Sequence, residues 1–188
     1  MLTLYYSPHM TSVDNEAGRA SGHADVPLSA RGREQSRELG RHYADVPLDA
    51  VISSDLQRAT ATVELAFATR GVPILRDARL RECDYGSLTQ VPPDQLDESR
   101  HVTEPFPGGE SYQMVVERMG TFLREVARDY DGKTIVLIGH KATRFALAYW
   151  CGESTLEEIV REPWEWRDIP IWRYELTLDH LQRRSAIS

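Results

Sequence analysis

The chain has 188 residues, enough for one α/β domain with a sizeable core that needs neither disulfides nor a structural metal. Its 22 basic and 29 acidic residues give a formal net charge of −7, which argues against a nucleic-acid or anionic-membrane surface. The composition, 41% hydrophobic and 27% charged, is that of a folded protein, and no apolar run approaches the length of a membrane span. We therefore expect one cytoplasmic domain over residues 1–188, with Cys83 and Cys151 as reduced thiols.

Short apolar runs alternate with helix-forming stretches in the first half of the chain. Strands are predicted at 2–6, 50–52 and 72–75, because each run is apolar and is bounded by turn residues. Helices are predicted at 30–43, capped by Ser29, and at 55–70, where apolar residues recur every third or fourth position. Residues 7–28 show no such period and are expected to form a long functional loop.

The second half continues the alternation after a loop-rich segment. Residues 77–109, with four prolines, are expected to cover one end of the sheet as a lid or specificity segment. The run 134–138 is continuously apolar and branched, as in a parallel strand covered on both faces. The other predicted elements are helices at 110–130 and 142–151, an edge strand at 171–178 and a polar, frayed tail from 182. Together these predict a doubly wound, mostly parallel sheet with helices on both faces.

Two histidines stand where a parallel sheet places its ligands. His9 follows the strand at 2–6, and His140 follows the strand at 134–138 after a single glycine. Ligands of open parallel sheets bind beyond the carboxyl ends of the strands. Either histidine alone could simply cap a loop, but the pair indicates a functional site.

Five blocks of residues in order resemble one known family, the histidine phosphatase superfamily, also called phosphoglycerate-mutase-like. The matching segments are 53–59, 80–86, 108–111 and 136–140, preceded by a first block around His9. The matching positions of that first block are His9, Asn15, Arg19, Gly22, Asp25, Pro27, Leu28, Ser29, Gly32 and Gln35. The resemblance covers about 130 residues and implies the same α/β fold.

This resemblance implies a phosphatase that works through a phosphohistidine. His9 would be the nucleophile, Arg58 and His140 would hold the phosphoryl oxygens, and Glu82 would donate the proton to the leaving group. Asp84 and Glu110 compete with Glu82 for the role of acid. The chemistry requires neither a metal nor another cofactor.

The loop after His9 and the partners of the protein are predicted in more general terms. Ser12, Asn15 and Arg19 either contact phosphate or substrate, or stabilise their loop. The expected partner is a small phosphorylated metabolite. Binding to nucleic acid or to a membrane is not expected, and the chain could form a homodimer. Hydrolysis is favoured over mutase transfer because the mutases of the family usually have longer chains.

The sequence departs from the family pattern beside both histidines. Pro8 stands where the family has arginine, Met10 and Thr11 replace glycine and glutamate, and Lys141 replaces the glycine after the second histidine. Lys141 could return the lost positive charge, although an ammonium cannot reproduce a bidentate arginine fork. Three readings stay open: a phosphatase with a rebuilt pocket, a different reaction on the same scaffold, or a noncatalytic module that binds an anion or a partner.

The other histidines and three tryptophans are predicted to have no role in the site. No metal-ligand spacing links the histidines, and surface positions are expected for His23, His42, His101 and His180. Core or edge packing is expected for Trp164, Trp166 and Trp172.

Overall fold

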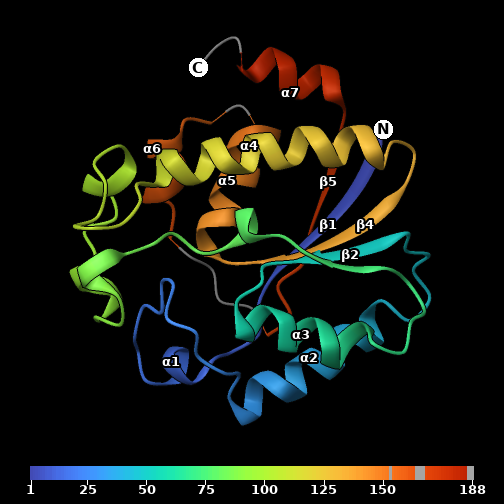
Figure 1. Cartoon of the computed structure of the whole chain (residues 1–188), viewed down its shortest axis with the longest axis horizontal. Coiled ribbons are helices and arrows are strands. Elements are labelled where there is room, and N and C mark those ends of the chain that lie inside the picture. Colours follow the sequence, from blue (N-terminus) through green and yellow to red (C-terminus); the bar gives the residue numbers. More distant parts are fainter. Residues whose placement is uncertain (153, 164–167, 186–188) are drawn as a thin grey trace.

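A five-stranded sheet forms the centre of the computed structural model, which describes residues 1–152, 154–163 and 168–185. Its strand order is β3-β2-β4-β1-β5 (Figure 1). The strands are β1 (Leu2–Pro8), β2 (Ala50–Ser53), β3 (Ile74–Arg76), β4 (Thr134–Gly139) and β5 (Trp172–Leu176). The first four pair in parallel, and β5 runs antiparallel to β1. The predicted mostly parallel α/β sheet is confirmed.

Helices cover both faces of this sheet. They are α1 (Val13–Glu16), α2 (Ala30–His42), α3 (Gln57–Phe67), α4 (Tyr112–Asp129), α5 (Lys141–Cys151), α6 (Leu156–Arg161) and α7 (Leu178–Ser185). Figure 1 shows α2 and α3 on one side of the strands and α4 and α5 on the other. In the described part of the chain, no helix has the length and apolar character needed to cross a membrane.

The continuous apolar run of β4 is explained by the two helical layers. Ile135 and Leu137 join the core cluster beneath α4 and α5, whereas Val136 and Ile138 join the cluster beneath α2 and α3. Successive side chains of a strand point to opposite faces, so a strand buried on both faces has no polar positions. Strand β4 thus forms the centre of both cores.

The C-terminal segment differs from its prediction. The expected frayed tail is wrong as far as Ser185, because α7 is an ordered helix over Leu178–Ser185. Leu181 is fully buried, and the His180 ring bonds the carbonyl of Trp150 at 2.9 Å. One apolar anchor inside a polar stretch is enough to dock a short helix, and periodicity alone does not reveal it.

The structure also tests the burial predicted for single histidines, cysteines and tryptophans. His42 is exposed as predicted, but His101 is buried and stacks on Phe106 at 3.9 Å between ring centroids, so its surface prediction is wrong. His23 and His180 are half-buried. Both cysteines are unpaired, as predicted, and Trp172 packs half-buried in β5. Trp164 and Trp166 lie outside the described residues.

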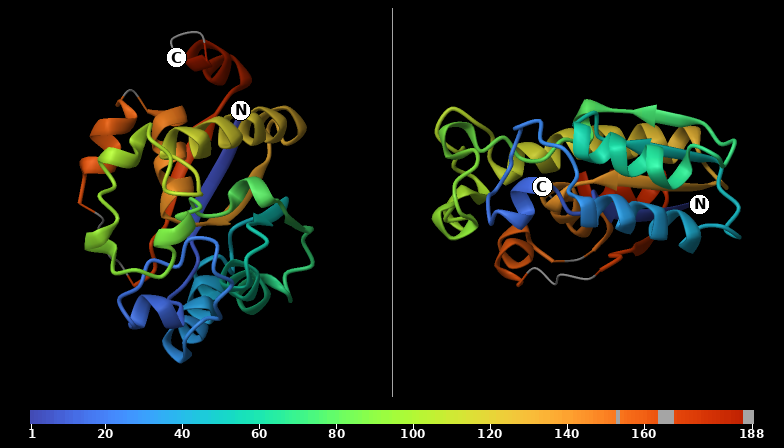
Figure 2. Two further views of the ribbon diagram at one scale, coloured as in Figure 1. Left: turned by 60° about the vertical axis from the view of Figure 1, so that its left-hand side comes forward. Right: turned by 90° about the horizontal axis from the view of Figure 1, so that it is seen from below.

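The segment 77–109 covers one end of the sheet, as expected. It contains four single-turn 3₁₀ helices: η1 (Ala78–Leu80), η2 (Gly86–Leu88), η3 (Pro93–Gln95) and η4 (Arg100–Val102). The right view of Figure 2 shows the light-green part of this segment at one end of the molecule, next to the blue loop that carries α1.

Candidate active site

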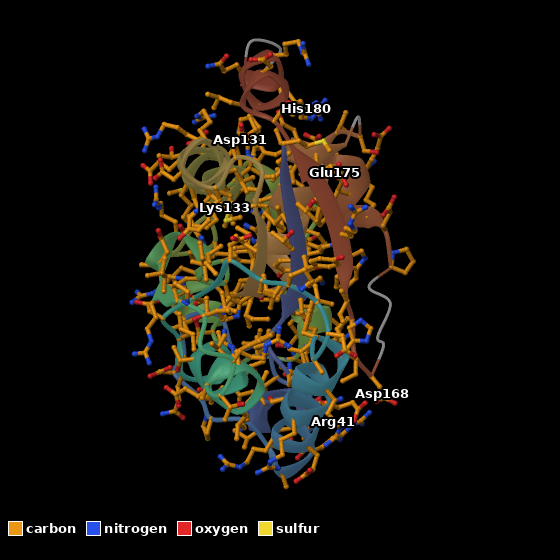
Figure 3. The ribbon with its side chains drawn as sticks, turned by 90° about the vertical axis from the view of Figure 1, so that its right-hand side faces the viewer. Arg41, Asp131, Lys133, Asp168, Glu175 and His180 are labelled. Carbon is orange, nitrogen blue, oxygen red and sulfur yellow. The ribbon has the colours of Figure 1, made fainter. Side chains whose placement is uncertain are left out.

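A cavity of about 320 Å³ opens at the carboxyl ends of β1 and β4. Its walls come from the loop at 8–22, the segment at 82–98 and the stretch at 168–170, with Gln35, Arg58 and Lys141 from the helices. Figure 3 shows Asp168 near the helix of Arg41, at the end of the molecule opposite Asp131 and His180. Among the described residues, no group of three or more histidine, cysteine or carboxylate side chains could hold a metal ion.

The His9 ring has a defined tautomer. Its Nδ1 lies 2.7 Å from the Met10 carbonyl oxygen, which only accepts, so Nδ1 carries the hydrogen. Nε2 then keeps its lone pair and accepts a bond from Arg58 Nε at 3.1 Å. Burial, together with the nearby charge of Arg58, lowers the pKa of His9 to about 3. His9 is therefore a neutral imidazole with a basic nitrogen at the cavity.

Arg58 positions its charge beside that nitrogen. It lies in the first turn of α3 and is 1% exposed, and its fork donates to the carbonyls of Gly22 and Ala24, each at 2.8 Å. These partners are neutral, so they orient the guanidinium without cancelling its charge. Burial lowers the pKa of Arg58, yet an arginine remains protonated. The site thus contains a fixed positive charge in contact with His9.

His140 lies beside His9, with 5.0 Å between the two ring centroids. The ring is fully buried, and neither of its nitrogens has a hydrogen-bond partner within the described structure. Burial and the charge of Arg58 hold its pKa well below the usual value, so this ring is neutral too. Unsatisfied buried polar groups are costly, so a ring in this state is suited to accept a hydrogen-bond partner. His140 is not among the residues that line the cavity, so it stands directly behind His9.

The backbone of His140 is held by two side chains. Tyr6 donates its hydroxyl to the His140 carbonyl, and the Thr143 hydroxyl accepts from the His140 amide at 2.6 Å. The hydroxyl oxygens of Tyr6 and Thr143 are also within hydrogen-bond distance of each other, at 2.9 Å. These contacts fix the turn from β4 into α5 and hence the position of the second histidine.

Glu82 interacts with the N-terminus of α5. Its Oε1 accepts from the amides of Cys83 and Ala142, both at 2.9 Å, and its Oε2 accepts from the Lys141 amide at 3.0 Å. These three amide contacts fix the carboxyl group of Glu82 at the start of α5. Of the three carboxylates predicted as candidate acids, Glu82 alone lines the cavity; Asp84 and Glu110 lie outside its lining.

Arg118 and His23 support the loop of Glu82, and sequence reasoning missed both roles. Arg118 donates to the Glu82 carbonyl at 2.9 Å and pairs with Glu110, and His23 Nε2 donates to the same carbonyl at 2.8 Å. Burial raises the pKa of Glu110, but its bond and ion pair with Arg118 outweigh this and leave the pKa lowered. No local pattern links Arg118 in α4 to a loop more than 30 residues earlier.

The four predicted substrate-binding residues have different surroundings. Asn15, Arg19 and Lys141 line the cavity, whereas Ser12 does not. Ser12 is buried, and its backbone amide and hydroxyl both bond the Asn15 side chain at 2.9 Å, which stabilises the loop.

Besides Arg58, two cations from the described ranges line the cavity, Arg19 and Lys141; we call their surroundings the rim, and both are already paired. Lys141 Nζ lies 2.7 and 2.8 Å from the carboxylate oxygens of Glu98, a residue that the sequence analysis did not single out. Arg19 donates to the buried Asp14 at 2.9 and 3.0 Å. Lys141 therefore does not direct its charge toward His9.

A parallel sheet with two histidines at adjacent strand ends, beside a buried arginine and a carboxylate, defines an α/β protein of the phosphoglycerate-mutase-like type. Residues 8–175 match the model of the histidine phosphatase superfamily (branch 1), and the chain belongs to this superfamily.

Similar proteins agree with this assignment. The chain is 31% identical over 166 residues to the probable phosphoglycerate mutase GpmB of Salmonella choleraesuis, covering 83% of this chain and 75% of that protein. The structure of Bacillus stearothermophilus YhfR has the same fold, with a TM-score of 0.79, 24% identity and coverage of 91% and 90% of the two chains. The alpha-ribazole phosphatase from Shigella flexneri superposes with a TM-score of 0.72 at 26% identity, over 84% and 83%.

Proposed function

We propose that this protein is a histidine-type phosphatase that hydrolyses a small phosphomonoester through a phosphohistidine on His9. The observation that carries the proposal is the state of the His9 ring: Nδ1 is held by a carbonyl at 2.7 Å, and Nε2 keeps a lone pair at the cavity beside Arg58. Membership of the superfamily and the phosphatase among the similar structures support the same reaction class.

In the first step, the Nε2 lone pair of His9 attacks phosphorus and the ester P–O bond breaks. The leaving oxygen takes a proton from Glu82. Oε1 of Glu82 already accepts two amide bonds and Oε2 accepts one, so Oε2 is the oxygen with room for that proton. The products of this step are the free alcohol, phosphohistidine and ionised Glu82.

In the second step, a water attacks the phosphorus and the P–N bond breaks. Glu82 accepts the proton of the attacking water, which restores the acid for the next cycle. Inorganic phosphate leaves and His9 regains its neutral ring. Proton donor and acceptor are the same group, and the two steps need no metal ion.

The transferred phosphoryl group needs donors for its equatorial oxygens. Arg58 supplies a charged donor beside His9, and the unpaired ring of His140 supplies a neutral N–H. Burial, together with the charge of Arg58, lowers the pKa of both histidines, so both rings are neutral and Arg58 carries the positive charge that an anionic phosphoryl group would meet. Asn15 and Arg19 also line the cavity, and Arg19 is far more exposed than Arg58, so we assign these two residues to the side of the leaving alcohol.

The phosphate pocket of this chain is atypical. Pro8 and Met10 line the cavity where the family pattern has arginine and glycine, and Lys141 is held by Glu98 and does not replace the arginine. Fewer charged donors mean weaker binding of the phosphoryl group. We therefore expect this phosphatase to bind inorganic phosphate and vanadate weakly.

Trapping the covalent intermediate tests the proposal. Protein mixed with radiolabelled phenyl phosphate and quenched should retain a label that is labile in acid and stable in base. The label and the turnover should disappear in His9→Ala and persist in His42→Ala, a change at an exposed histidine. Turnover should also survive a chelator.

Two results would contradict the proposal. Turnover that requires a divalent ion and survives His9→Ala would indicate a different reaction on this scaffold. Phosphate binding without label or turnover on any monoester would indicate a noncatalytic anion-binding module.

A further inference from the structure

The cations at the rim of the cavity already form ion pairs with carboxylates of the same chain. The cations lining it are Arg19, Arg58 and Lys141, within the part of the chain that the structure describes. Arg58 bonds neutral carbonyls and His9, whereas Arg19 pairs with Asp14 and Lys141 with Glu98. Of these three cations, Arg58 beside His9 is therefore the one without a carboxylate in direct contact.

The pair of Lys141 and Glu98 is held firmly. Both oxygens of Glu98 contact Nζ, at 2.8 and 2.7 Å, and Tyr112 donates its hydroxyl to Glu98 Oε1 at 2.9 Å. The two side chains are 29% and 21% exposed, so water and salt screen the pair only in part. Phe145 lies against the lysine, with Nζ 5.4 Å from its ring centroid. A substrate group that needed Lys141 would have to displace Glu98 from three contacts.

The carboxylates near the rim are likewise paired. Glu98 and Asp168 line the cavity and pair with Lys141 and Arg31, and Asp14 pairs with Arg19. The remaining walls include the apolar side chains of Met10 and Leu96. An anionic group on the leaving alcohol would meet matched ion pairs and apolar surface, without an unpaired cation on the described rim.

From this arrangement, and resting on the proposed phosphatase function, we infer that the substrate is a monoester whose leaving alcohol carries no carboxylate or second phosphate. Glu98 is the specificity-determining residue, because it neutralises Lys141 and so removes the cation that would pair with an anionic leaving group. Phosphoglycerates, which carry a carboxylate, fall in the excluded class.

Two aryl phosphates of equal size test the inference. 4-Carbamoylphenyl phosphate and 4-carboxyphenyl phosphate differ in one charge, and the readout is the ratio of their kcat/KM values. The wild-type chain should favour the neutral ester by about tenfold or more, because a carboxylate loses water at a partly buried rim that offers it no free cation. The pair sn-glycerol 3-phosphate and 3-phosphoglycerate should show the same preference with aliphatic leaving groups.

Glu98→Gln should remove most of this preference. Glutamine retains the size of the side chain and an oxygen for Tyr112 but leaves the charge of Lys141 uncompensated, so the ratio should shift toward the carboxylated ester by about tenfold. Adding Lys141→Met to Glu98→Gln should cancel the shift, since the cation would be gone. Glu104→Gln is the matched control: it removes an exposed carboxylate paired with Arg100 on the same segment, outside the cavity lining, and the ratio should not change.

The outcomes separate this inference from the proposed function. A wild-type preference for the carboxylated ester, or an unchanged ratio in Glu98→Gln, overturns the inference while the phosphatase assignment stands. Absence of turnover on both esters, in the wild type and every variant, overturns the proposed function itself. The wild-type ratio decides the inference even if Glu98→Gln does not fold.

Discussion

The floor and the rim of the cavity are built in different ways. On the floor, His9, Arg58 and Glu82 are all oriented by main-chain groups: the Met10 carbonyl, the carbonyls of Gly22 and Ala24, and the amides around the start of α5. At the rim, Arg19 and Lys141 are oriented by other side chains, Asp14 and Glu98.

This difference separates what the fold determines from what a single substitution can change. Main-chain groups do not change with residue type, so the floor depends on the sheet and the helix ends. A side-chain pair is lost when either partner is replaced. We therefore expect substitutions on the floor to affect the rate of all substrates and substitutions at the rim to affect the choice among them.

The largest effect is expected on the floor, at Arg58. Arg58→Lys retains the charge but loses the fork that bonds His9 and two carbonyls. Loss of a preorganised donor typically lowers the rate by about 10²- to 10³-fold, and kcat/KM should fall to that extent for neutral and anionic esters alike. Steady-state kinetics on the matched esters measures this.

Arg70→Lys is the control for Arg58→Lys. Arg70 also bridges carbonyls, donating to Ala44 and Val46 at 2.7 Å each, but it lies outside the cavity lining. It should lose stability without a loss of kcat/KM beyond about twofold. If both variants lose activity equally, Arg58 acts only by holding the fold together.

A smaller, substrate-dependent effect is expected at Glu82. Glu82→Gln retains an oxygen for the amides of α5 but has no proton to donate, so alkyl esters should slow by about 10²-fold. Nitrophenyl phosphate, whose leaving group scarcely needs a proton, should slow only a few-fold. Rates on both esters give the comparison, and Asp84→Asn, outside the cavity lining, should not discriminate between them. Equal losses on both esters would make Glu82 a purely structural residue.

The smallest effect concerns stability against acid. His9 has a pKa of about 3 in the folded chain, and an unfolded histidine titrates near its ordinary value of 6.5. Between these values the unfolded chain binds more protons, so the free energy of unfolding rises with pH and falls as pH is lowered through this window. The lowered pKa of His140 acts in the same direction. Each histidine should contribute up to about 1.4 kcal/mol per pH unit.

Urea unfolding at several pH values within this window measures that slope. His9→Gln should make the slope shallower by up to about 1.4 kcal/mol per pH unit, while the exposed His42→Gln should leave it unchanged. An unaltered slope in His9→Gln would show that the folded protein tolerates a charged His9.

Much of the floor was predictable from the sequence, and little of the rim was. His9 and His140 each follow an apolar strand, and strand ends of a parallel sheet meet at one edge. The position of Arg58 followed from a local block of the family pattern. In contrast, Glu98 and Lys141 are 43 residues apart and belong to no common period. Only the path of the segment 77–109 brings them together, and no local rule determines that path.

The same dependence on distant contacts explains why the predictions for His101 and for the C-terminal segment were wrong. His101 has the composition of a surface loop around it, yet it is buried on Phe106 because the segment folds back on itself. Leu181 is one apolar residue in a polar stretch, and only its contact with the core shows that α7 is a docked helix. Sequence patterns predict regular elements well, whereas the burial of single residues in irregular segments depends on distant partners.

The position of β1 in the sheet has a consequence for the order of folding. β1 pairs with β4, with Thr3 opposite Thr134 and Pro8 opposite Gly139, and with β5 on its other side. Both neighbours lie far along the chain from β1, beginning at Thr134 and Trp172. Contacts so distant in sequence form slowly. During synthesis β1 should therefore stay unpaired, with its apolar side chains exposed, until β4 has been made, and His9 should meet His140 only when β1 and β4 pair.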